Sequence, residues 1–388
     1  MSQIVSMPTP AHAAATAEPM IGTPARSVTE LRAMSFRILA RMYIPEEREF
    51  YFRIRATANG IVPEGRSRRY AAITLIGLAT EKPQDCAIAL RGHTPLIACS
   101  RLAQDVETVT NLGDVALSSW AAHLLGSPDR ERIWRRLVEL ATPDAAQPTV
   151  EVSWALTAAS LQKDLDKTGL ANKLAARLMQ AFPRKSRVFP HVLGASRAQV
   201  ACFADMVYPI QALSYYHMLT SDPQALEIAT QAAARIVEAQ GPAGQWWWHY
   251  DVRSGRVIEG YPVYAIHQDA MGPMCLFALR DAGGPDHSAA IRKGLDWLYH
   301  SPEINGSLID PQADVIWRKV WRREPGKFSR YAQAAASYLH PSIRIPGLNA
   351  LFPPKSVDAE CRPYHLGWLL HAFPAARAAA WDRKVRGV

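Results

Sequence analysis

The chain has 388 residues, 48% hydrophobic and 20% charged, with a formal net charge of +9 and a pI of about 9.4. This composition is typical of a globular protein and excludes a fibrous or wholly disordered chain. The positive balance favours an acidic substrate, but the basic residues are scattered and belong to no nucleic-acid-binding module, so we expect no nucleic-acid partner. Five widely spaced cysteines form no CxxC pair, which predicts neither a disulfide framework nor a zinc cluster.

Residues 1–27 are rich in Ala, Pro and Thr, and we predict a disordered lead-in. They lack a basic segment followed by a continuous apolar one, so we expect no secretory signal. No stretch of the sequence approaches the length of apolar chain that crosses a bilayer, so we expect no integral membrane contact. A cytoplasmic location is the resulting prediction.

Residues 28–388 are predicted to form one domain, with residues 28–67 as an N-terminal extension. A helical apolar stripe over 28–43 follows a capping-box sequence at Ser27, whereas 44–67 contains two prolines and two glycines and is predicted to be irregular. Apolar periodicity predicts further helices at 68–80, 84–90, 95–109, 113–125, 129–140, 148–161, 165–182, 197–219, 223–240, 262–282, 286–300, 329–339 and 362–386. Pro209 is expected to kink or split its helix.

Helices joined by short links over most of the chain are typical of a helical repeat, either an open solenoid or a ring closed on itself. One β-hairpin is predicted near residues 247–258, where two short strand-like segments flank Ser254-Gly255. The segment Gln240-x-x-x-Gly244-x-Trp246 resembles the QW repeat of the terpenoid cyclases and their prenyltransferase-like relatives, and residues 294–308 resemble it loosely. This resemblance implies an all-α fold, an (α/α)6-type toroid of helical hairpins around a central cavity.

The catalytic signatures of those families are missing, because neither a DxDD nor a DDxxD motif occurs, and Cys361 to His365 only weakly resembles a zinc-ligand set. Other users of this toroid are carbohydrate-active enzymes, namely the six-hairpin glycosidases, polysaccharide lyases and sugar epimerases. They share no short motif that the chain could be matched to. The resemblance therefore supports an architecture and leaves the activity open.

A candidate site lies between Gln240 and Cys275, a segment with three consecutive tryptophans, three tyrosines, two histidines, two aspartates and a glutamate. Aromatic rings stack on sugar rings, and carboxylates bind hydroxyls or transfer protons, so this mixture favours a saccharide site. The catalytic candidates are Asp251, Glu259, Tyr264, His267 and Asp269. The alternative to a saccharide site is a structural role, in which the tryptophans pack into the ring and His267 is a buried core histidine.

Two further segments supply polar side chains at helical spacing. One is 203–211, whose stripe of polar groups would face the cavity from an inner helix, and the other is 362–368, which opens the last helix. The substrate-binding candidates are Asp205, Tyr208, Gln211, Trp246, Trp247, Trp248, His249, Tyr250, Tyr261, Arg362, Tyr364, His365 and Trp368. Arg318, Arg322 and Arg323 are expected to form a solvated basic face, with carboxylate or phosphate binding as the alternative.

The sequence thus predicts a cavity enzyme that acts on a saccharide, an acidic one being favoured by the charge. Glycosidic cleavage would use Asp251, Glu259 and Asp269 as acid and base, whereas lyase or epimerase chemistry would use His267 and Tyr264, with an arginine neutralising a uronate. The alternatives are a terpenoid-cyclase-like enzyme with an aromatic cavity, and a non-catalytic helical scaffold. We expect no metal and no cofactor, and the oligomeric state stays open.

Overall fold

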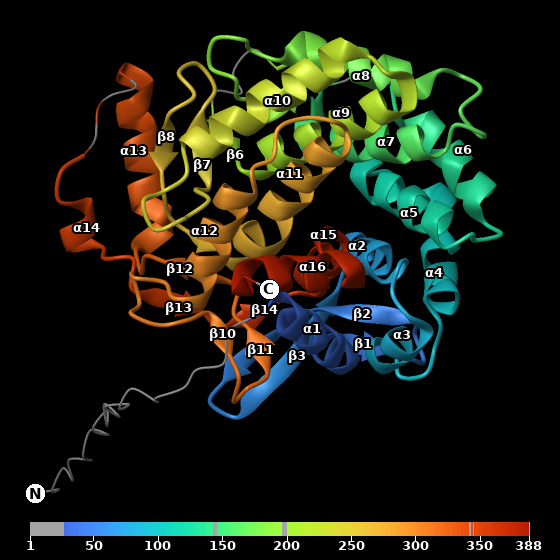
Figure 1. The fold of residues 1–388 in the computed structure, drawn as a ribbon, viewed down its shortest axis with the longest axis horizontal. Coiled ribbons are helices and arrows are strands. Elements are labelled where there is room, and N and C mark those ends of the chain that lie inside the picture. The colour runs from blue at the N-terminus through green and yellow to red at the C-terminus, as the bar shows by residue number, and fades with distance from the viewer. Residues whose placement is uncertain (1–26, 143–145, 196–199, 341–342, 344, 388) are drawn as a thin grey trace, which may run out of the picture.

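The computed structural model describes residues 27–142, 146–195, 200–340, 343 and 345–387 (Figure 1). The predicted lead-in, apart from Ser27, lies outside these residues. Ser27 caps the first helix in a capping box with Glu30, as its sequence predicted. No helix among the described residues is both long and apolar enough to span a bilayer.

An inner ring of helices forms the centre of the fold. In the described chain its members are α2 (Arg68–Leu78), α5 (Leu112–Leu124), α7 (Thr149–Leu161), α9 (Ala204–Thr220), α11 (Gly272–Asp281) and α15 (Pro363–Ala372). Each packs against the next, and α15 packs against α2 and closes the ring. Several inner helices are buried on nearly all sides, as in α7, which explains why their sequences are apolar all round.

An outer layer covers the ring. It contains α1 (Val28–Met42), α3 (Pro83–Ala89), α4 (Pro95–Ala103), α6 (Arg130–Leu140), α8 (Leu170–Ala181), α10 (Pro223–Glu238), α12 (Ser288–Tyr299) and α16 (Ala375–Arg386). These helices bury one face only: α6 buries Ile133, Trp134 and Leu137. In Figure 1 the red C-terminal helices lie beside the blue N-terminal ones, which is the closure of the toroid.

Closure depends on two glycines at the crossing of α2 and α15. A Cβ atom at Gly77 would lie 2.1 Å from the carbonyl oxygen of Gly367, and one at Gly367 would lie 2.6 Å from that of Ile73. Since both obstacles are backbone atoms, neither can swing aside. The absence of side chains at these two positions therefore lets the first and last inner helices touch directly.

The segment predicted to be irregular is instead a long β-hairpin. Strands β2 (Glu49–Thr57) and β3 (Gly60–Arg66) pair antiparallel, with Thr57 opposite Gly60, and β2 also pairs with β1 (Tyr43–Ile44) and β14 (Glu360–Cys361). Pro63 and the glycines signal broken chain in the sequence, but β3 is an edge strand, where a proline costs no ladder hydrogen bond. This hairpin stands beside α15, against which β2 packs.

The hairpin predicted near 247–258 is confirmed as β7 (His249–Asp251) and β8 (Val257–Glu259), joined by β6 (Val200–Cys202) on its free side. Residues between α12 and α15 add β10 (Ile309–Asp310), β11 (Val315–Ile316), β12 (Lys319–Trp321), α13 (Phe328–Leu339), α14 (Leu348–Leu351) and β13 (Ser356–Asp358). Strand β12 lies between β13 and β9 (Val263–Tyr264), and β4 (Gln147–Pro148) pairs with β5 (Val192–Leu193). A π-helical turn, His267–Met271, leads into α11.

Several boundaries differ from the sequence-based expectation. The predicted helix 262–282 begins with strand β9 and turns helical only after Tyr264, and the described part of the predicted helix 197–219 begins with strand β6, because these segments pair with β12 and β7. The predicted helices 95–109 and 165–182 are shorter in the structure, since α4 ends at Ala103 and α8 begins at Leu170. Helix α9 runs through Pro209 without a break, because the neighbouring helices hold it on both sides. The predicted helix 362–386 is divided at Pro374, which precedes α16 and cannot continue α15.

Candidate functional site

The inner helices α2, α5, α7, α9 and α15 all begin at the same end of the ring, as contacts between their first turns show. Arg69 of α2 binds Asp114 of α5 at 2.7 Å and Glu151 of α7 at 3.1 Å. The rings of Tyr70 and Tyr364, at the starts of α2 and α15, stack 4.2 Å apart. We call this end the mouth of the toroid. It presents the first turns of five helices to a ligand, as helix N-termini do in other cavity enzymes.

A cavity of about 330 Å³ opens beside the mouth, between the β7–β8 hairpin segment and the β9–β12 pair. It is lined by Trp248, His249, Tyr261, Pro262, Tyr264, Arg318, Lys319, Trp321, Arg322, Glu324 and Arg330. We call it the first cavity. Its wall is therefore a mixture of aromatic rings and basic side chains.

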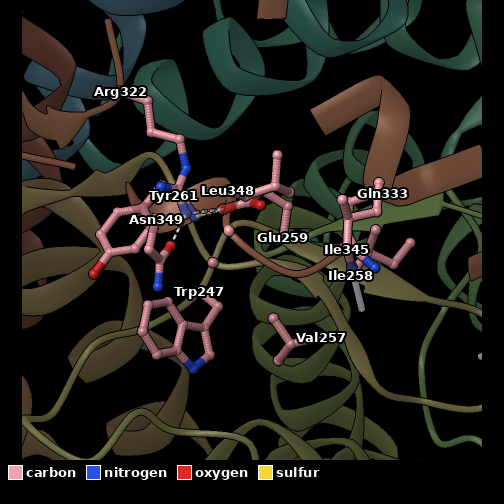
Figure 2. Close-up of a pocket in the computed structure, with 12 residues that line it drawn as sticks. Trp247, Val257, Ile258, Glu259, Tyr261, Arg322, Gln333, Ile345, Leu348 and Asn349 are labelled. Atoms are coloured by element: carbon pink, nitrogen blue, oxygen red, sulfur yellow. Dashed lines mark hydrogen bonds and ion pairs between the residues drawn. The ribbon is translucent and has the colours of Figure 1, made fainter. Parts of the chain in front are cut away.

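A second cavity of about 440 Å³ adjoins it and shares Tyr261 and Arg322 with it. Figure 2 shows this cavity, in which Arg322 reaches toward Glu259 and Asn349. It is lined by Trp247, Val257, Ile258, Glu259, Gly260, Tyr261, Arg322, Gln333, Ile345, Gly347, Leu348 and Asn349. The two shared side chains place the cavities next to each other along one surface.

The aromatic wall of the first cavity is held by ring contacts. Trp248 lies 4.6 Å from the ring of Tyr264 and stacks on His267 at 5.3 Å with an interplanar angle of 3°. His267 is buried, and this burial lowers the pKa of its imidazole to about 3. A neutral His267 therefore serves as a flat support behind Trp248, which keeps the indole fixed for a ligand.

The basic wall is formed by Arg318 and Lys319, which both contact the ring of Tyr264. The guanidinium of Arg318 lies 5.1 Å and the ammonium of Lys319 lies 5.4 Å from the centre of that ring. Burial, and next the charge of Arg318, lower the pKa of Lys319, while Asp358 at 3.1 Å opposes them. A lysine with a lowered pKa and a tyrosine in the same cavity are groups that can exchange protons with a ligand.

The expectation of a solvated basic face is wrong for two of its three arginines. The side chain of Arg318 is only 19% exposed, and that of Arg322 is 5% exposed against Glu259 at 3.1 Å. Only Arg323 is exposed, as predicted. The strand β12 explains the difference, because its pairing with β9 and β13 folds the basic segment inward, which no local pattern indicates.

Glu360 anchors the arginines behind this wall. Its carboxylate is 2.6 Å from Arg53, 2.7 Å from Arg318 and 2.7 Å from Arg362, with 2% of the side chain exposed. Burial raises the pKa of Glu360, but the charges of Arg318 and Arg362 and the hydrogen bonds with Arg53 and Arg362 outweigh it and lower the pKa overall. One buried carboxylate thus holds three guanidinium groups at the mouth.

His191, Cys202 and Asp205 form a separate cluster of ligand-type side chains. Their ligating atoms all lie within 4.8 Å of one another, and among the described residues they are the group of three that could hold a metal ion. Nδ1 of His191 is 3.0 Å from Oδ2 of Asp205, and the amide of Cys202 donates to the same oxygen at 2.7 Å. The hydrogen bond with Asp205 raises the pKa of His191.

The predicted catalytic residues fall into two groups. Tyr264 lines the first cavity and Glu259 the second. Asp251 is buried in the hairpin, where it accepts hydrogen bonds from the amides of Arg253 and Ser254 at 2.7 and 3.1 Å. Asp269 is fully buried and bound to His365 at 2.7 Å, and His267 supports Trp248. The last three candidates therefore lie in the framework around the cavities.

The predicted binding residues are distributed in the same way. Four of them line a cavity: Trp247, Trp248, His249 and Tyr261. Tyr364 and Arg362 lie at the mouth, where Arg362 donates to the hydroxyl of Tyr70 at 2.8 Å. The others are packed inside the ring or bound to its side chains: Asp205, Tyr208, Gln211, Trp246, Tyr250, His365 and Trp368.

Lys319 was not among the predicted site residues, and neither was His191. Lys319 occurs in a basic stretch whose inward orientation depends on strand pairing. His191 stands in a loop before Asp205 in the sequence, and only the fold brings its ring to that carboxylate. An isolated histidine or lysine in a connecting segment carries no periodic signal that would have singled it out.

The arrangement of the helices defines an (α/α)6 toroid, a fold that solved structures of other proteins share. An unsaturated glucuronyl hydrolase specific for heparin is similar, with a TM-score of 0.58 and 13% identity over 93% of this chain and 97% of that one. The cellobiose 2-epimerase of Bacillus thermoamylovorans B4167 gives a TM-score of 0.60 with 11% identity over 89% of this chain and 98% of that one.

A glucuronyl hydrolase of Bacillus sp. GL1, described as responsible for the degradation of glycosaminoglycan, gives a TM-score of 0.55 with 12% identity over 93% of this chain and 96% of that one. No protein-family model and no curated protein sequence matches the chain. At these identities the likeness establishes the fold, and the chemistry has to be argued from the site itself.

Proposed function

We propose that the protein is a carbohydrate-active enzyme that binds an acidic saccharide in the first cavity and acts on it by proton transfer. The observation that carries this proposal is the placement of the Arg318 guanidinium and the Lys319 ammonium 5.1 and 5.4 Å from the centre of the Tyr264 ring, in a cavity that Trp248 also lines. The toroid likeness supports it, since the similar structures are named for glucuronyl hydrolysis and cellobiose epimerisation. We also propose that residues 28–388 form one domain and that the protein is cytoplasmic.

Substrate binding would use both walls of the cavity. The indole of Trp248 offers an aromatic face on which a sugar ring can stack, and Tyr261 extends that face toward the second cavity. The guanidinium of Arg318 is suited to bind a carboxylate through two hydrogen bonds. A uronate bound in this way would have its carboxylate at Arg318 and its ring against Trp248.

The chemistry follows from the acidity of the proton next to a uronate carboxylate. Arg318 would stabilise the negative charge that develops when this proton leaves, and Lys319, with its lowered pKa, is the group best prepared to accept it. Tyr264, whose ring both cations contact, lines the same cavity, and its hydroxyl would donate a proton to the leaving oxygen or to the opposite face of the sugar. Donation to the leaving oxygen gives elimination, and donation to the opposite face of the sugar gives epimerisation.

The alternatives are less well supported. Hydrolysis needs two carboxyl groups on opposite sides of a bond, whereas Asp251 and Asp269 are buried against Arg253 and His365, and only Glu259 of the three predicted carboxylates lines a cavity, where Arg322 binds it. A terpenoid cyclase needs a cavity that stabilises a carbocation, and the charges of Arg318, Lys319 and Arg330 would oppose one. A non-catalytic scaffold gives no reason for basic groups to converge on a cavity.

Ligand-dependent thermal stabilisation tests the proposal directly. Uronic-acid oligosaccharides should raise the melting temperature of the wild-type protein, and neutral oligosaccharides and prenyl diphosphates should raise it less. The Arg318→Gln variant should lose the shift, while Arg323→Gln, which changes an exposed neighbour, should keep it. A shift with prenyl diphosphates alone, or one that Arg318→Gln retains, would contradict the proposal.

Turnover separates the chemical groups from the binding groups. With a uronate substrate found by thermal shift, Lys319→Met and Tyr264→Phe are each expected to lower kcat by about 10²- to 10⁴-fold, the usual contribution of a general acid or base. Elimination appears as absorbance of the new double bond, and epimerisation as a changed product on chromatography. If both variants keep wild-type kcat, these groups do not carry protons.

A further inference from the structure

The cluster of His191, Cys202 and Asp205 is a second chemical feature near the cavity, independent of its basic wall. His191 precedes β5, Cys202 ends β6 and Asp205 lies in the first turn of α9. Their potential ligand atoms all lie within 4.8 Å of one another. Segments that are apart in the sequence thus bring an imidazole, a thiol and a carboxylate to one point.

The three atom types form a recognisable ligand set. Zinc binds imidazole nitrogen, thiolate sulfur and carboxylate oxygen at about 2.0–2.3 Å, which places tetrahedral ligands roughly 3.3–3.7 Å apart. Nδ1 of His191 is 3.2 Å from Oδ1 and 3.0 Å from Oδ2 of Asp205. An ion could therefore enter with shifts of the ligand atoms of a few tenths of an ångström to about one ångström, without rearranging the backbone.

The backbone already holds the cluster in place. The amide of Cys202 donates to Oδ2 of Asp205 at 2.7 Å, which fixes the carboxylate beside the thiol. Strand β6 pairs with β7, so that Cys202 lies opposite His249, and the side chain of Asp205 is completely buried. An oriented, desolvated carboxylate is the arrangement that outer hydrogen bonds give to metal ligands.

A hydrogen-bonded His–Asp pair alone would not need the thiol. The other four cysteines are buried in the apolar interior, whereas Cys202 is partly exposed and lies beside a carboxylate and an imidazole. Without an ion the Cys202 thiol is hydrogen-bonded to the Asp205 carboxylate, but a protonated thiol is only a weak donor. As a thiolate, by contrast, it is one of the strongest ligands for zinc, and that role accounts for its place in the cluster.

Neighbours of the cluster line the first cavity, although its three members do not. His249, the β-sheet partner of Cys202, lines that cavity, and so does Arg330, whose charge acts on His191. The side chain of His191 is 55% exposed, so the cluster is open on one side. Three protein ligands with an open fourth position are typical of catalytic rather than structural zinc.

We infer that His191, Cys202 and Asp205 bind one zinc ion, with the fourth position left to water or to an oxygen of the ligand in the first cavity. The sites of binding and proton transfer proposed above do not depend on this ion. The two proposals therefore stand or fall separately.

Metal content and cobalt spectroscopy test the inference on the full-length protein. After chelation and dialysis, the protein should take up one equivalent of Zn²⁺, measured by elemental analysis. With Co²⁺ in its place, it should show the near-ultraviolet charge-transfer band of a thiolate ligand. Cys202→Ser should abolish that band, and Asp205→Asn and His191→Asn should weaken zinc affinity by more than about 10-fold.

Two controls keep the result interpretable. Cys86→Ser changes a buried cysteine remote in sequence from the cluster and should leave both stoichiometry and spectrum unchanged. Circular dichroism identifies any variant that fails to fold. If Asp205→Asn or His191→Asn does not fold, the cobalt band of the conservative variant Cys202→Ser decides whether the cluster binds metal. Uptake well below one equivalent, or a cobalt band that survives Cys202→Ser, would overturn the inference, whatever the saccharide-binding experiments show.

Discussion

Replacing Glu360 by glutamine tests whether one buried carboxylate organises the mouth. Glu360 contacts Arg53, Arg318 and Arg362 at 2.6–2.7 Å and is almost completely buried. The amide of glutamine has nearly the same volume and keeps one oxygen acceptor, so the packing survives. The negative charge disappears, and three guanidinium groups are left facing one another.

The expected loss of stability follows from the environment of the pair. Removing one partner of a fully buried ion pair costs about 3–5 kcal/mol, because the remaining charge stays desolvated. The three arginine side chains are 25%, 19% and 14% exposed, so water relieves part of that cost. We therefore expect Glu360→Gln to lower the free energy of unfolding by about 2–3 kcal/mol.

Urea unfolding at neutral pH measures the change, and Glu64→Gln is the matched control. Glu64 also binds two arginines, at 2.7 and 2.6 Å, but its side chain is 34% exposed, so its removal should cost much less. Because the folded protein depresses the pKa of Glu360, its contribution is present above the unfolded value of 4.5 and is lost as the pH falls through the folded pKa. Equal, small losses for both variants would refute the reasoning.

Gly77→Ala should destabilise the protein by at least about 2 kcal/mol, since its Cβ would lie 2.1 Å from a backbone oxygen. Gly306→Ala is the control in the same urea experiment, because its Cβ would lie 3.7 Å from its nearest neighbour, the carbonyl oxygen of Ile304. His267 and His371, whose pKa burial lowers to about 3 and about 4, should each reduce stability by about 1.4 kcal/mol per pH unit as the pH falls from 6.5 toward those values, because only the unfolded chain takes up the proton. His371→Leu should remove one of these slopes, and an unchanged pH dependence would contradict the assignment.

The helices were predictable because their signals are local. Apolar periodicity and capping residues located most of them, and the turn at Ser254-Gly255 located the β7–β8 hairpin. Hairpin β2–β3 was not predicted, because Pro63 is acceptable only on an edge strand, and edge position is a property of the finished sheet. The same holds for Pro209, whose helix is maintained by its neighbours.

The site was predictable in its location but less so in its members. The aromatic segment does line both cavities, through Trp247, Trp248 and Tyr261. Ionisable residues in the same segment were equally conspicuous in the sequence, yet Asp251 and Asp269 are used to hold a turn and a buried histidine. Composition cannot distinguish these uses, because burial and partners depend on contacts between distant segments.

The cluster of His191, Cys202 and Asp205 was not predicted for a similar reason. Cys202 and Asp205 are close in the sequence, but His191 lies on the other side of β5 and β6. A search for short ligand spacings finds only groups within one turn or one hairpin. This cluster is instead assembled from a loop, a strand and the start of a helix.

The closure of the ring also constrains the order in which the protein can be made. Helix α2 leaves the ribosome long before α15, the partner against which Gly77 packs. Until α15 has been made, the apolar face of α2 has no final partner, and contacts between such distant segments form slowly. Nascent chains should therefore depend on chaperones until α15 is released, and the mouth forms only after that step.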